Sequence, residues 1–159
     1  MGFFTAQTRR REPVRERLTV LREIYRMREA QAQAAQGYLA DAEAYRMLLP
    51  RAALLFAQLS KTASEHARGL EELLLENGIS LPCKEGLEGE RAQVQPTAQS
   101  LQKALHLCGA RCREDAMRYR LTAKAARSER TRLSLIALSE AYEELAAAPD
   151  SIAARLSRS

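Results

Sequence analysis

Tryptophan is absent from this sequence of 159 residues, aromatic residues make up 5% of it, and glycine and proline occur only seven and five times. Alternating runs of β-branched and polar residues, which would indicate strands, are missing as well. The chain is instead rich in alanine, leucine, glutamate, glutamine and arginine, which are good helix formers. This composition argues against a β-sheet and predicts an all-α protein.

Long apolar runs are missing too. No stretch approaches the roughly 18 apolar residues that a membrane-spanning helix requires, so we expect no membrane partner. The three cysteines are an odd number without the framework of a small secreted domain, which favours a reduced, cytoplasmic protein. With two histidines, no glycine-rich phosphate loop and no Ser-His-Asp arrangement, we predict no catalytic residue and favour a protein that is not an enzyme.

Positive charge gathers near the N-terminus. The net charge is +5, and eight arginines lie between residues 9 and 28. Such a cluster can bind nucleic acid or an anionic membrane. Glutamates are interleaved with these arginines, and Tyr25 alone could stack on a base, so we interpret the cluster as a solvated helix face and predict no nucleic-acid partner. A basic adaptor for nucleic acid is one alternative, which salt-dependent binding would reveal.

Apolar residues recur at every third or fourth position in four segments, which predicts four helices. The expected helices span residues 13–49, 50–77, 96–127 and 128–148. Proline begins the first two, and Thr97 and Ser128 can cap the last two. Gly78 takes the usual position of glycine after a helix. The helix boundaries are therefore marked by residues with known preferences for them.

The four helices are expected to form one bundle with a single long connection. Short turns join the first helix to the second and the third to the fourth, so each pair should be antiparallel. Residues 79–95 are aperiodic and too long for a tight turn, which predicts a crossover along the bundle and a ferritin-like fold. The chain then divides into a basic arm (1–12), the bundle (13–148) and a short tail (149–159).

The first helix is predicted to extend beyond the length that the fourth helix matches. Its additional apolar stripe consists of Val14, Leu18, Leu21 and Tyr25. An uncovered apolar stripe favours association with a second copy, so we expect a homo-oligomer, in the simplest case a homodimer. The sequence identifies no other protein partner.

An internal repeat relates the two halves of the chain. The pattern DAxxYR occurs at residues 41–46 and again at 115–120. A weaker match places LSKTASEHA, residues 59–67, over LSEAYEELA, residues 138–146. Because both pairs repeat in the same order, a duplicated hairpin is favoured, and two such hairpins would form the bundle.

These segments resemble the two hairpins of rubrerythrins and related ferritin-like proteins. The resemblance covers roughly residues 35–147 and is carried by GYLADAEAYRML, LSKTASEHARGLEELL, CREDAMRYRLTAKAA and RLSLIALSEAYEELA. It implies a di-iron site with one glutamate from each of two helices and a Glu-x-x-His pair from each of the other two. It also implies an oxidoreductase or an iron-handling protein.

Most of the implied iron ligands are replaced in this chain. His66 stands at the position of the family's histidine in the second helix, but Ala63 takes the glutamate position three residues earlier. The other four ligand positions hold Tyr38, Cys112, Tyr142 and Leu145. We therefore predict a bundle that needs no cofactor and serves as a binding or structural module.

A remodelled metal site is the first alternative, ahead of the basic adaptor. If the register differs by a turn, Asp41 and Asp115 could face inward, since each lies three residues after a stripe position. Together with His66 and Cys112 they would be the candidate metal ligands, and iron would be the cofactor. The protein would then be a divergent metal-binding oxidoreductase or an iron-handling protein.

Single residues in this set also have simpler interpretations. His66 can be a hydrogen-bonded histidine in the core. Cys108 and Cys112, four residues apart on one helix, could be a thiolate pair, although small buried apolar residues are the more common case. We expect no disulfide between them, because two residues of one regular helix do not meet the geometry that a disulfide requires. Cys83, in the predicted crossover, is expected to be the more exposed thiol.

Overall fold

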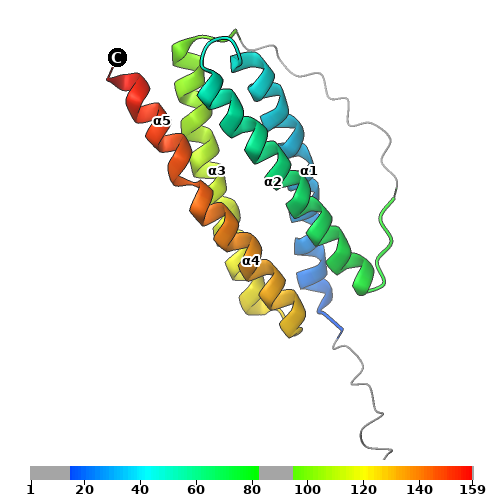
Figure 1. Cartoon of the computed structure of the whole chain (residues 1–159). Coiled ribbons are helices and arrows are strands. Elements are labelled where there is room, and N and C mark those ends of the chain that lie inside the picture. Colours follow the sequence, from blue (N-terminus) through cyan, green and yellow to red (C-terminus); the bar gives the residue numbers. More distant parts are fainter. Residues whose placement is uncertain (1–14, 83–94, 159) are drawn as a thin grey trace, which may run out of the picture.

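The computed structural model describes residues 15–82 and 95–158, and these ranges are helical without any strand. The helices are α1 (Leu18–Tyr45), α2 (Pro50–Glu76), α3 (Ala98–Ala125), α4 (Glu129–Leu145) and α5 (Ala147–Ser157) (Figure 1). The predicted all-α class is confirmed over these residues. Within the same ranges, no helix combines the length and the apolarity that crossing a membrane demands.

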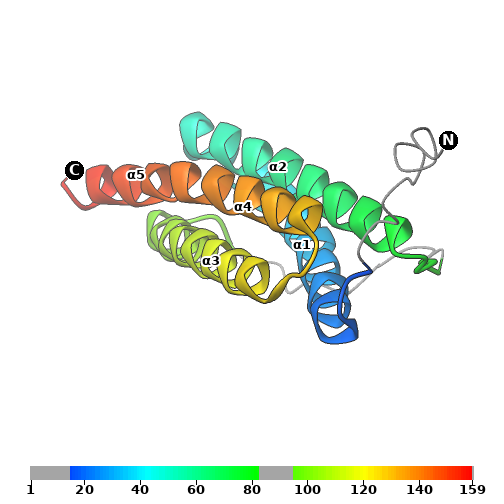
Figure 2. The ribbon, with the colours of Figure 1, turned by 90° about the horizontal axis from the view of Figure 1, so that it is seen from below.

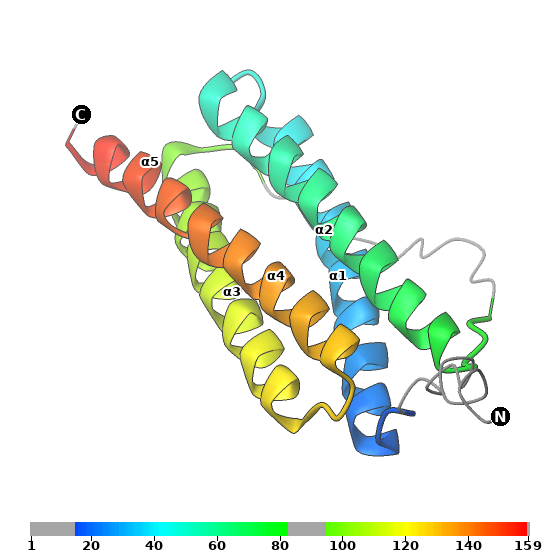
Figure 3. The same ribbon diagram turned by 60° about the horizontal axis from the view of Figure 1, so that its bottom comes forward.

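The helices pack as two antiparallel hairpins. α1 lies against α2, and α3 lies against α4, while α5 continues the direction of α4 (Figure 1 and Figure 3). Seen from below, the α1–α2 hairpin lies beside the α3–α4 hairpin (Figure 2). α2 ends at the end of the bundle where α1 begins, and α3 begins at the opposite end (Figure 1). Most of the predicted crossover, residues 83–94, lies outside the described residues.

Local sequence signals place the helix ends close to the predicted positions. Gly78 follows α2 with φ of 79°, the left-handed conformation that favours glycine, and its amide donates to the carbonyl of Leu75 at 3.0 Å. Thr97 and Ser100 form a reciprocal capping box at the start of α3. Ser128 accepts a hydrogen bond from the first turn of α4. These caps are confirmed predictions.

The C-terminal segment differs from the predicted tail. Pro149 lies in the first turn of α5, where the missing N–H removes no helical hydrogen bond, so the chain stays helical to Ser157. Pro149 and Ala153 are buried. Gly109 allows α3 to lie close to this segment, because a Cβ there would be 2.8 Å from Oδ1 of Asp150. Residues 147–157 therefore pack on the bundle.

The apolar stripes predicted for α2, α3 and α4 face the interior. The stripe predicted for α2 is buried at all of its positions, which are Phe56, Leu59, Ala63, His66, Leu70 and Leu73. The stripe of α3 is buried apart from Asp115, which is half-buried. In α4, Leu135 and Tyr142 of the predicted stripe are buried, while Leu138 and Leu145 are half-buried. The recurrence of apolar residues every 3.6 positions identifies these faces, because few polar residues interrupt it in these helices.

The stripe predicted for the first half of α1 is wrong in part. Val14 lies outside the described residues, and Leu18 is 61% exposed. The buried face is centred on Val20, Ile24 and Met27. It packs on the chain's own bundle, so the uncovered stripe that suggested a homodimer is not present in α1. Self-association stays a prediction without that support.

Part of the arginine cluster is described. Residues 1–14, which include the predicted arm and Pro13, lie outside the described ranges. In α1, Arg26 lies 3.5 Å from Glu23, and Arg28 lies 3.2 Å from Glu29. The Arg26–Glu23 pair agrees with a solvated face of mixed charge, whereas the side chains of Arg28 and Glu29 are only 18% and 19% exposed.

Glu16 ties the start of α1 to the turn between α3 and α4. Its carboxylate is 7% exposed and accepts hydrogen bonds from the backbone amides of Arg127 (2.7 Å) and Ser128 (2.9 Å). Its own amide donates to Oδ1 of Asn77, at the end of α2. Burial raises the pKa of Glu16, but the N–H donors outweigh it, and the net pKa lies below its usual value. One residue thus joins three helix ends.

Replacing Glu16 by alanine is expected to lower the free energy of unfolding by about 2 kcal/mol, because two buried amides lose an ionised acceptor. Urea unfolding at pH 7 measures the change. Glu23→Ala, which removes a more exposed glutamate of the same helix, is the matched control and should change stability by no more than about 0.5 kcal/mol. Equal effects of the two substitutions would contradict the capping role.

Candidate functional site

A layer of polar side chains crosses the interior between the four long helices. We call it the polar layer; its members are Gln31 of α1, His66 of α2, Asp115 and Tyr119 of α3, and Tyr142 of α4. Asp115 is half-buried, and the other four expose 4% or less of their surface. Polar groups at this depth require partners, so their hydrogen bonds determine what the layer can do.

Gln31 links three helices within the layer. The hydroxyl of Tyr142 donates to its Oε1, and its Nε2 donates to Oδ2 of Asp115 at 3.0 Å. A primary amide both accepts and donates, so one side chain serves both partners. Sequence reasoning missed Gln31 because a glutamine appeared to interrupt the stripe. Its position, one heptad before Tyr38 on the buried face of α1, was the signal that could have identified it.

His66 is a hydrogen-bonded histidine of the core. Its Nδ1 lies 3.2 Å from the hydroxyl of Tyr119, and its ring centre lies 4.3 Å from that of Tyr142. The rings of Tyr119 and Tyr142 are nearly parallel. Burial lowers the pKa of His66 to about 4, so the imidazole is neutral at pH 7. The polar layer is therefore packed by aromatic rings as well as by hydrogen bonds.

The four candidate ligands from the sequence lie in two neighbouring regions, the polar layer and a cleft beside it, and Asp115 belongs to both. His66 and Asp115 belong to the polar layer, where their partners are Tyr119 and Gln31. Cys112 lies beside Cys108 on α3. Asp41 lines a cleft between α1 and α3. Among the residues described, no three or more His, Cys, Asp or Glu side chains are grouped so that they could hold a metal ion.

The donor set of the polar layer does not fit two irons. It offers one imidazole and one carboxyl group, together with an amide and two phenols. Burial raises the pKa of Tyr119 and of Tyr142, which keeps both phenols protonated. Di-iron sites in helical bundles use several carboxylates, which balance the charge of the metals. Here Ala63, at an implied glutamate position, is fully buried as part of the apolar core.

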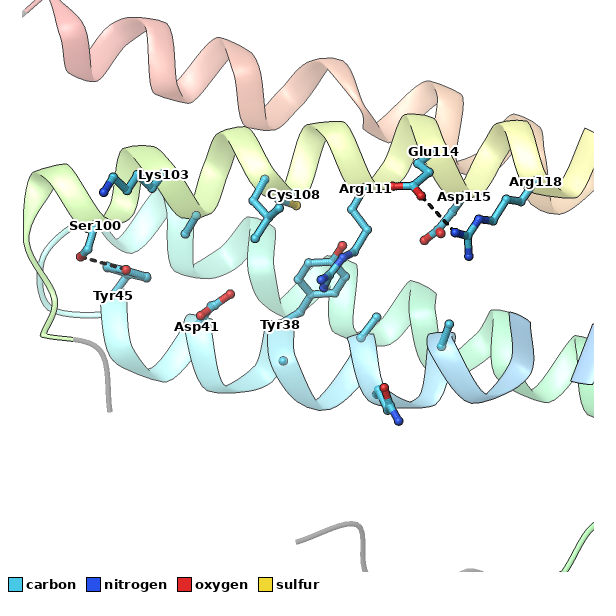
Figure 4. Close-up of a pocket in the computed structure, with 16 residues that line it drawn as sticks. Tyr38, Asp41, Tyr45, Ser100, Lys103, Cys108, Arg111, Glu114, Asp115 and Arg118 are labelled. Carbon is cyan, nitrogen blue, oxygen red and sulfur yellow. Dashed lines mark hydrogen bonds and ion pairs between the residues drawn. The ribbon is translucent and has the colours of Figure 1, made fainter. Parts of the chain in front are cut away.

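A solvent-open cleft of about 770 Å³ lies between α1 and α3 (Figure 4). Small residues of α1 make room for it. Its charged lining contains three basic and three acidic residues: Lys103, Arg111, Arg118, Asp41, Glu114 and Asp115. Arg118 pairs with Glu114 at 3.1 Å, and a hydrogen bond of 3.0 Å from Tyr45 to Ser100 joins the two helices at one end of the cleft. The cleft is therefore polar and balanced in charge.

Two free cysteines lie on the buried face of α3, and the first of them borders this cleft. Cys108 and Cys112 are 3% and 0% exposed, and Cys108 lines the cleft. Their thiols are hydrogen-bonded to each other and to the hydroxyl of Tyr38. The bond to Cys112, together with burial, raises the pKa of Cys108, while the same bond lowers the pKa of Cys112. Cys83 lies outside the described residues.

Comparisons with known proteins do not place the chain in a family. It matches no protein-family model, and no curated protein and no solved structure is significantly similar to it. The function must therefore be inferred from the chemistry of the polar layer and of the cleft.

Proposed function

We propose that this chain is a ferritin-like helical bundle that acts as a binding or structural module and has lost the di-iron chemistry of rubrerythrin-like proteins. The polar layer carries the proposal. A core built for iron would leave several carboxylates without partners when the metal is absent, which is costly in the interior. In this layer Tyr142, Gln31 and Asp115 satisfy one another, and His66 is paired with Tyr119.

The ferritin-like part of the proposal is supported by the internal repeat. Tyr45 and Tyr119, the tyrosines of the two DAxxYR segments, are 2% and 1% exposed. Ser60 and Ser139, which match in the weaker repeat, each donate a hydrogen bond to a backbone carbonyl, at 2.7 Å and 2.6 Å. The matched residues are buried in both hairpins, as expected for a duplicated unit, although Ser60 donates to Ala35 of α1 and Ser139 donates to Ile136 of its own helix.

A binding role has a suitable surface in the α1–α3 cleft. It is open to solvent, and charged groups of both signs line it. Catalysis by the polar layer has less support, because the layer is closed by its own hydrogen bonds and its imidazole is buried. The proposal therefore separates two regions: the polar layer stabilises the bundle, and the cleft meets the partner or ligand.

Iron analysis tests the proposal. Protein produced with added iron is expected to hold well under one equivalent, and an iron chelator should leave its melting temperature unchanged, since the polar layer needs no metal to satisfy its groups. Two equivalents of iron, with a loss of thermal stability on chelation, would restore the oxidoreductase alternative. A single metal ion that is lost in His66→Ala would indicate a remodelled site instead.

A further inference from the structure

The thiols of Cys108 and Cys112 form a pair that the polar layer does not use. Residues four apart on a helix share a face, and these two side chains are hydrogen-bonded to each other. Neither is in a disulfide. Both are almost fully buried, yet Cys108 borders the α1–α3 cleft, which gives a small ion a route to the sulfurs. Two soft donors therefore lie on one face of α3, and one of them borders the cleft.

The number of donors selects the kind of ion. Thiolates prefer soft cations such as Cu(I), or zinc. Structural zinc takes four protein ligands, and among the described residues no further histidine, cysteine or carboxylate completes a group of three around these sulfurs. Monovalent copper, by contrast, binds stably between two sulfur ligands. We propose that Cys108 and Cys112 hold one Cu(I) ion beside the cleft.

The surroundings suit the charge of that complex. One Cu(I) ion replaces two thiol protons, which pass to water; two S–H bonds break, two Cu–S bonds form, and copper stays monovalent. The bis-thiolate complex carries one negative charge. Arg111 extends from α3 toward Tyr38 of α1 and supplies a positive charge beside it (Figure 4). The hydroxyl of Tyr38 can donate to a sulfur, as it already contacts both cysteines.

The test is an anaerobic titration of the reduced full-length protein with Cu(I), in competition with the chromogenic chelator bicinchoninate. The wild-type chain is expected to withdraw one equivalent of copper. Cys108→Ala/Cys112→Ala should lose at least 100-fold in affinity, while the matched control Cys83→Ala keeps the wild-type value. Circular dichroism verifies that each variant is folded, and Cys108→Ser/Cys112→Ser, which keeps polar groups at both positions, serves if the alanine variant unfolds.

Tyr38→Phe is a finer probe, since it removes one hydrogen bond to sulfur and should weaken copper binding several-fold without changing the stoichiometry. The proposal is overturned if the double variants bind copper as tightly as the wild type does, or if Cys83→Ala abolishes binding. Tighter binding of zinc than of Cu(I) would also overturn it, because zinc would require ligands beyond the two sulfurs. The result does not depend on the iron content of the polar layer.

Discussion

Gln31→Leu is expected to lower the free energy of unfolding by about 3 kcal/mol, because two buried groups lose their partner at once. Leucine fills nearly the same volume, so packing contributes little to the loss. The hydroxyl of Tyr142 would lose its acceptor, and the carboxyl group of Asp115 would lose its donor. Tyr142→Phe leaves only Gln31 with an unused acceptor, so its expected loss is smaller, about 1 to 2 kcal/mol.

Urea unfolding of the single and double variants measures these losses. Gln36→Leu, on the exposed side of the same helix, is the matched control and should remain within about 0.5 kcal/mol of the wild type. In the double variant the two losses should not add, because both substitutions break the same hydrogen bond. A neutral or stabilising Gln31→Leu would show that the polar layer does not hold the bundle together.

Acidification from pH 7.5 to pH 5.0 is expected to remove about 2 kcal/mol of stability through His66 alone. Burial lowers the pKa of this residue from its usual 6.5 to about 4 in the folded chain. The unfolded chain therefore takes up a proton below pH 6.5 that the folded chain does not bind. Stability is complete above pH 6.5 and falls as the pH decreases toward 4.

The difference between wild type and His66→Gln isolates this contribution, since glutamine keeps a polar side chain but does not titrate. Its stability should fall less over the same interval, by about 2 kcal/mol. His106→Gln is the matched control, because it makes the same substitution at an exposed histidine of α3. The pKa values of Glu16, Glu76 and Glu143 are lowered, so the contributions of these carboxylates are lost at more acidic pH. Parallel pH curves for wild type and His66→Gln would refute the prediction.

Local signals in the sequence were enough to predict where α2 ends, where α3 and α4 begin, and most of the buried faces of α2, α3 and α4. They were not enough for the start of α1, where Leu18 and Val20 are both compatible with a helical period. Packing against the neighbouring helices determines which of these faces is buried. The local sequence of α1 does not specify that packing. The prediction that the last helix ends before Pro149 was wrong for a similar reason. Proline is as compatible with the first turn of a helix as with its end.

The candidate site was predictable only where one residue carried the signal. His66 as a core histidine follows from its place on the apolar stripe of α2. The role of Gln31 depends on Asp115 and Tyr142, which are 84 and 111 residues away along the chain. Asp41 and Asp115 occupy matching positions of the repeat. The repeat alone, however, does not indicate that Gln31 donates a hydrogen bond to Asp115. Such differences arise from tertiary contacts and leave no local pattern.

Glu16 reaches Arg127 and Ser128 only when the α1–α2 hairpin and the α3–α4 hairpin have come together. Its hydrogen bonds to Arg127 and Ser128 span 111 and 112 residues, and contacts that close such long loops form late in folding. An interaction that is absent from the folding transition state acts on the unfolding rate and barely on the folding rate. Glu16 therefore determines how long the folded bundle persists rather than how quickly it forms.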